Sequence, residues 1–153
     1  MKIKTIEAVN AYKAIKEMKL NSLSEDTLIS VWKNQKALRH VSEEYDKDVE
    51  DAKKSLEDDK HAEMVKRLQA AMEREKLVKE GKHEMTPEEK QDVQEINKWF
   101  AEYQTRGKKF FDDAAEKEVE IEITKLPENE ILKALKENGK TFEAVESLVW
   151  MME

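Results

Sequence analysis

The chain contains no cysteine, and it has only three glycines and two prolines. The missing cysteines exclude disulfides and thiolate metal sites. Three glycines are too few for a Gly-rich phosphate loop. Neither glycine nor proline occurs between Met1 and Glu80, so no local feature forces a helix break in that stretch. The shortage of turn-forming residues predicts long helices.

Long hydrophobic runs are also missing. No apolar stretch approaches the roughly 20 residues that cross a bilayer, and charged residues appear within the first four positions. We therefore expect a cytoplasmic protein with no membrane partner.

Catalytic signatures are absent as well. The histidines His40, His61 and His83 are far apart in the sequence, and none belongs to a helical metal-binding pair. No serine or threonine stands in a nucleophile elbow, and few carboxylates lie near an apolar seam that could raise their pKa. The sequence predicts that the protein is not an enzyme and has no catalytic residue, no cofactor and no metal.

Charge, by contrast, is abundant. Charged residues make up 41% of the chain and apolar residues 39%, which favours long solvent-exposed helices over a thick core. Residues 1–40 carry eight Lys or Arg against four acidic residues, whereas residues 43–63 carry ten acidic residues against four Lys. The net charge of −7 argues against nucleic acid as the main partner, because phosphate binding relies on clustered Lys and Arg.

The clearest predicted element is a helix that begins at Pro87. Thr86 and Glu89 have the spacing of a capping box around this proline. Its apolar seam runs through Val93, Ile96, Phe100, Tyr103, Gly107, Phe110 and Ala114. Because Gly107 lies on the seam, either a neighbouring helix passes close to it or the helix bends there, and we favour close packing.

A longer helical arm precedes this helix, and Ser24 is its predicted N-cap. The apolar seam of the arm includes Leu28, fails at residues 57–60 and resumes in a different phase at Met64. The helix either rotates its apolar face or breaks near Asp58, and both alternatives remain open. The second arm covers only part of its length, which favours an oligomer or a binding surface.

The ends of the chain carry smaller elements. Residues 119–126 alternate with a period of two, and the acidic face of this strand suits pairing with Lys2 and Lys4 in a two-stranded ribbon. Pairing with a second copy or with a partner's edge is the alternative. Thr5 is the predicted cap of a first short helix. Pro127 and Thr141 open two more at the far end.

The last helix and the aromatic residues of the second arm are the candidate interaction surface. The last helix either folds back onto the hairpin as core or anchors a partner. The aromatic side chains either widen the core to receive the N-terminal helix and the two C-terminal helices or line a cavity for a small ligand. The candidate residues are Leu148, Trp150, Met151, Trp99, Phe111 and Arg106.

Residues 1–12 (MKIKTIEAVNAY), the acidic strand at 119–123 and the apolar tail at 149–153 flank a charged helical middle. This order resembles a family of small uncharacterised proteins from tailed phages and prophages. The resemblance implies a phage or prophage origin and a non-enzymatic accessory role. It carries no catalytic or binding residue with it.

These observations predict a mainly α single domain, residues 1–153, built as an elongated antiparallel helical hairpin of coiled-coil type at 24–118. The N-terminal strand and helix occupy 1–23, and a strand and two short helices occupy 119–153. We expect an assembly or structural protein that contacts itself or a phage or host protein, in the host cytoplasm or on the virion. The alternative is a small anti-host protein that binds a host protein or sequesters a small ligand.

Overall fold

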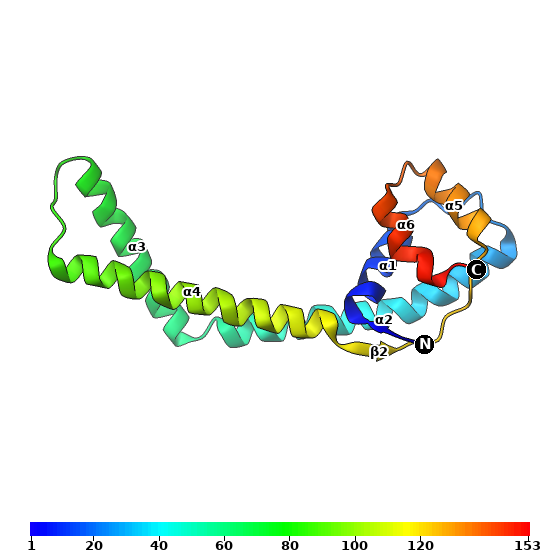
Figure 1. The fold of residues 1–153 in the computed structure, drawn as a ribbon, viewed down its shortest axis with the longest axis horizontal. Helices are drawn as coiled ribbons and strands as arrows, with labels where there is room; N and C mark the ends of the chain where they lie inside the picture. Colours follow the sequence, from blue (N-terminus) through cyan, green and yellow to red (C-terminus); the bar gives the residue numbers. More distant parts are fainter. The chain divides into compact units, whose positions relative to one another are not determined.

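The computed structural model describes residues 1–153, and most of them are helical. The helices are α1 (Thr5–Glu17), α2 (Glu25–Leu56), α3 (Asp59–Lys79), α4 (Pro87–Glu116), α5 (Glu128–Glu137) and α6 (Phe142–Leu148), followed by the 3-10 turn η1 (Val149–Met151) (Figure 1). Two short strands, β1 (Lys2–Lys4) and β2 (Glu118–Glu120), form an antiparallel pair. The predicted mainly α class, with a small ribbon and short terminal helices, is confirmed.

The chain forms two compact units. Residues 1–48 and 113–153 make up one, called here the terminal unit, and residues 49–112 make up the other, called here the hairpin unit. Helices α2 and α4 contribute to both, so the unit boundaries fall within the hairpin that we expected at 24–118. No helix is both long and apolar enough to cross a membrane.

The first arm breaks at Glu57 and Asp58. Helix α2 ends at Leu56, and Asp58 caps α3 by accepting a hydrogen bond from the amide of His61 at 2.9 Å. A carboxylate in this position satisfies an amide that has no partner in the first helical turn. The acidic run that interrupts the seam is therefore the start of a new helix. Of the two alternatives, the break near Asp58 is correct and the continuous helix with a rotated apolar face is not.

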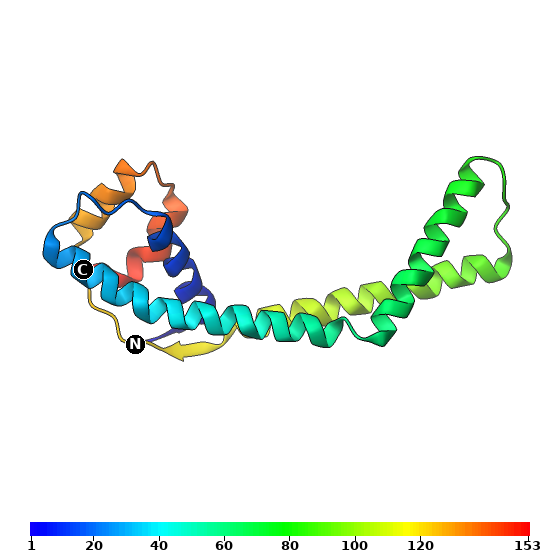
Figure 2. The ribbon, with the colours of Figure 1, turned by 180° about the vertical axis from the view of Figure 1, so that it is seen from behind.

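Helix α4 crosses α3, from which it diverges towards the turn that joins them, and then runs beside the last turns of α2 (Figures 1 and 2). Its capping box is present, because the amide of Glu89 donates to Thr86 Oγ1 at 3.2 Å and the amide of Thr86 to Glu89 Oε1 at 3.4 Å. Gly107 is buried against α2, but a Cβ there would lie 3.7 Å from Leu56 Cδ1. That is an ordinary contact, so the helices approach each other without requiring glycine.

The ribbon pairs Lys2 with Glu120 and Lys4 with Glu118, which confirms the predicted pairing of the two ends. The strand is shorter than the alternating pattern predicted. Ile121 still exchanges hydrogen bonds with Met1, at 2.9 and 3.0 Å, but beyond it Thr124 has another partner. The side chain of Asn34, on α2, accepts from the amide of Thr124 at 2.8 Å and donates to its carbonyl at 2.7 Å. A buried amide side chain thus replaces a neighbouring strand.

The core of the terminal unit lies where α1, α2, α5, α6 and η1 meet. Thr5 is the first residue of α1 rather than its cap, and its buried hydroxyl donates to the carbonyl of Lys117 at 2.8 Å. The C-terminal residues close this core, since the amide of Leu126 donates to the carbonyl of Met151 at 2.8 Å. Figure 2 shows the C-terminal segment among these helices.

Candidate protein-binding surface

An apolar patch lies on α2 in the terminal unit. Leu28, Ile29 and Trp32 are exposed by 41%, 46% and 60%, and with Leu20 and Gln35 they line a shallow groove of about 400 Å³. Single exposed apolar residues are normal, but three neighbours that include a tryptophan are typical of an interaction surface. Leu20 precedes α2, and we call the other four residues the α2 patch.

The opposite side of α2 explains why the patch is left uncovered. Val31, Leu38 and Val41 are turned into the core, where they meet α1 and the C-terminal residues. A helix that buries one side in this way has no further partner within the unit for its other apolar side chains. The side chains of the α2 patch stay exposed in the folded chain. Burial in the core therefore does not explain why these residues are apolar.

Charged residues frame the α2 patch at both ends. Glu25 lies one turn before Leu28, and Lys36 lies one turn after Trp32. The ammonium group of Lys36 is 5.9 Å from the centre of the Trp32 ring, within cation–π range. This tryptophan therefore has a charged neighbour on one side and solvent on the other.

The structure places Leu148 and Met151 in the core, exposed by only 1% and 0%. Helix α6 folds back onto α1 and α5, so these side chains cannot meet a partner while the unit stays folded. The expectation that they belong to an interaction surface is wrong for this reason, and the alternative that the last helix is core applies to them.

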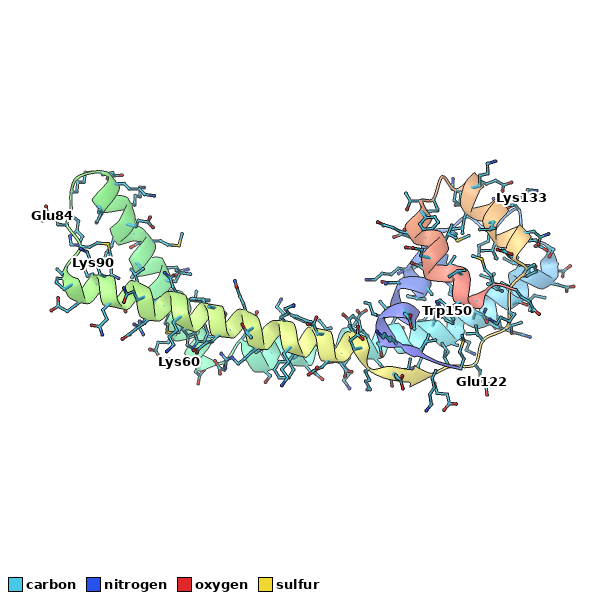
Figure 3. The ribbon with its side chains drawn as sticks, in the orientation of Figure 1. Lys60, Glu84, Lys90, Glu122, Lys133 and Trp150 are labelled. Carbon is cyan, nitrogen blue, oxygen red and sulfur yellow. The ribbon has the colours of Figure 1, made fainter.

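Trp150, labelled in Figure 3, is half-buried. Its indole N–H donates to the carbonyl of Ser147 at 3.0 Å, and its own carbonyl accepts from Lys125. It lines a groove of about 600 Å³ between α1 and α6, together with charged residues of both signs such as Lys13 and Glu146. This lining shows no preference for one ligand charge.

Trp99 and Arg106 lie in the hairpin unit. The Trp99 ring stacks on Tyr103 at 5.3 Å, Tyr103 stacks on His61 of α3 at 4.8 Å, and the Arg106 guanidinium lies 5.9 Å over Trp99. The rings thus pack α4 against α3, which is a different partner from the terminal helices expected for a widened core. A groove of about 550 Å³ beside Trp99 is lined by α4 alone, and Phe111 is 39% exposed outside the stack.

An ion network joins α3 to α4 on the same unit. Asp92 accepts from both Arg67 and Arg74, Arg67 also donates to Glu95 at 3.0 Å, and the Nε2 of His83 is 2.9 Å from Glu89. Arg67 is the main cause that lowers the pKa of Asp92, and His83 is the main cause that lowers the pKa of Glu89. Each carboxylate has a cationic or imidazole partner, so the network holds the two helices together. No group of acidic and histidine residues has the arrangement of a metal site.

The chain was compared with protein-family models, with curated proteins and with solved structures, and none of the three comparisons finds a match.

The α2 patch is the functional candidate that the sequence pattern concealed. The sequence pattern places Leu28 on the apolar seam of the first arm and does not include Ile29 or Trp32 in it. Counting all apolar residues between 28 and 32 would have revealed a stripe too wide for a helix with one buried side. That excess is the signal of an unpartnered surface.

Proposed function

We propose that this chain is a non-enzymatic accessory protein that works by protein–protein contact, and that the α2 patch is its contact surface. The observation that carries the proposal is the exposure of Trp32 one turn after Leu28 and Ile29, on a helix whose other side is already buried. Large aromatic side chains in such positions dominate the binding energy of many interfaces. The resemblance to proteins of tailed phages supports an assembly or structural role.

Affinity purification from bacterial extract tests this proposal with matched variants. The full chain is compared with an Ile29→Ser/Trp32→Ser variant and with Phe142→Ser as the control, because Phe142 is exposed by 74% on another helix. We expect a protein in stoichiometric amount with the wild-type chain and with the control, and its loss with the patch variant. Equal recovery with all three would contradict the proposal.

The ligand-sequestering alternative has less support. Its cavity would have to form beside Trp99, where the groove is lined by one helix and the ring face is shared with Tyr103 and Arg106. Small-molecule sites usually enclose most of the ligand between several elements. A change in Trp99 fluorescence on addition of a nucleotide would favour this alternative over the contact role.

A further inference from the structure

The charges around the α2 patch are arranged with a twofold pattern. Glu25 and Lys36 are eleven residues apart, which is close to three helical turns, so both lie on the side of α2 that carries the patch. The midpoint between Glu25 and Lys36 falls between residues 30 and 31, and so does the midpoint between Ile29 and Trp32. One axis at this point would therefore exchange the members of both pairs.

We propose that the α2 patch binds a second copy of this chain, with the two α2 helices antiparallel. This inference rests on the proposed contact role and names its partner. Glu25 of each copy then lies beside Lys36 of the other, and Ile29 of each lies beside Trp32 of the other. The interface is isologous, so two ion pairs and a shared apolar centre come from a single helix face.

Charge selects this orientation over the parallel one. In a parallel pair Glu25 would face Glu25 and Lys36 would face Lys36, and like charges in contact disfavour assembly. Leu28 lies at the edge of this apolar centre, one turn before Trp32 on the same side of α2. One helix pair is a small interface, so we expect reversible association with a dissociation constant on the order of micromolar.

Charge reversal with mixing tests the arrangement. The variants Glu25→Lys and Lys36→Glu should each self-associate about tenfold more weakly than the wild-type chain, since both ion pairs become repulsive. An equimolar mixture of the two should associate more tightly than either alone, because every Lys of one copy then meets a Glu of the other. The double variant Glu25→Lys/Lys36→Glu should recover wild-type association.

Two control variants distinguish a loss of association from a loss of helix stability. Asp26→Lys makes the same charge change in the first turn and carries the same penalty with the helix dipole, but residue 26 lies off the patch. Lys33→Glu reverses a charge at the edge of the patch, at a position that the axis does not pair with Glu25. Sedimentation equilibrium should give both controls wild-type association, and circular dichroism should show equal helicity.

Two results would overturn the inference. One is a wild-type chain that stays monomeric up to about millimolar concentration, well above the expected constant. The other is a mixture that associates no better than its single components. If either occurs while the Ile29→Ser/Trp32→Ser variant still loses a captured protein, the contact role stands and only the second copy is excluded as its partner.

Discussion

The two units of this protein reach stability in different ways. The terminal unit has a continuous core in which Ala8, Leu38 and Met151 are each exposed by 0%. In the hairpin unit only Met64, Ile96 and Gly107 are buried, and the ion network and the aromatic stack span the helices instead. A helix that packs against a single neighbour has little interior, so long polar and aromatic side chains replace an apolar core. The exposed α2 patch thus belongs to the terminal unit, which already has an apolar core without it.

The largest expected effect of a single change is in the core of the terminal unit. Leu148→Ala should lower the free energy of unfolding of this unit by about 3 kcal/mol, because it removes buried methyl groups and leaves a cavity. Val149→Ala is the control, since Val149 is exposed by 53% and should change stability by less than about 0.5 kcal/mol. Urea denaturation followed by circular dichroism measures both. Equal effects would contradict the assignment of Leu148 to the core.

A second change tests the polar contact inside the same unit. Asn34→Ala should cost about 2 kcal/mol, because it removes two hydrogen bonds and leaves the backbone of Thr124 without partners. Hydrogen exchange of residues 121–126 should accelerate in this variant more than that of α1. Lys33→Ala, at the exposed neighbouring position, should leave the exchange of this segment unchanged.

The hairpin unit should be the more acid-sensitive of the two. Its folded state lowers the pKa of Asp92 and Glu89, so it binds fewer protons than the unfolded state. The stability that these groups contribute is complete above their ordinary pKa values, about 3.9 and 4.3, and is lost as the pH falls through the lower folded values. The terminal unit has one such group, Glu130 beside Ser24, but it also has a large apolar core.

Trp99 fluorescence reports this transition once the other two tryptophans are replaced by phenylalanine. The urea midpoint of the hairpin unit should fall between pH 5 and pH 3 more than the midpoint of the terminal unit, which hydrogen exchange follows. Asp92→Asn should have a lower midpoint at neutral pH and a weaker dependence on acid. A midpoint independent of pH in the wild-type chain would contradict the role of the network.

The smallest expected effect is a gain. Gly107→Ala should stabilise the hairpin unit by about 0.5–1 kcal/mol, because alanine favours the helix and its methyl group makes an ordinary contact with Leu56. Thermal unfolding followed by circular dichroism measures the change. A loss of stability would show that the helices pack more closely at this point than the structure has them.

The sequence predicted those features that local chemistry decides. The capping box at Thr86 and Glu89 depends on residues three positions apart, and the ribbon between the N-terminal residues and the acidic strand follows from alternation and charge, whereas its register was not predicted. The break at Asp58 could not be decided, because an acidic run suits an exposed helix face as well as a helix start. The hydrogen bonds between Asn34 and Thr124 join residues ninety positions apart, and no periodicity marks them. The α2 patch was missed for a related reason, since the side of α2 that is buried depends on where the distant C-terminal residues pack.

The most direct test of the contact role measures the exposure of Trp32 itself. A variant with Trp99→Phe and Trp150→Phe leaves Trp32 as the only fluorophore, and acrylamide quenching reports how much of its ring meets solvent. In the dilute chain the quenching should match a tryptophan exposed by 60%, and on binding of a captured protein or of a second copy it should fall towards that of a buried one. Quenching that stays unchanged while a complex forms would place the contact elsewhere on the molecule and contradict the account.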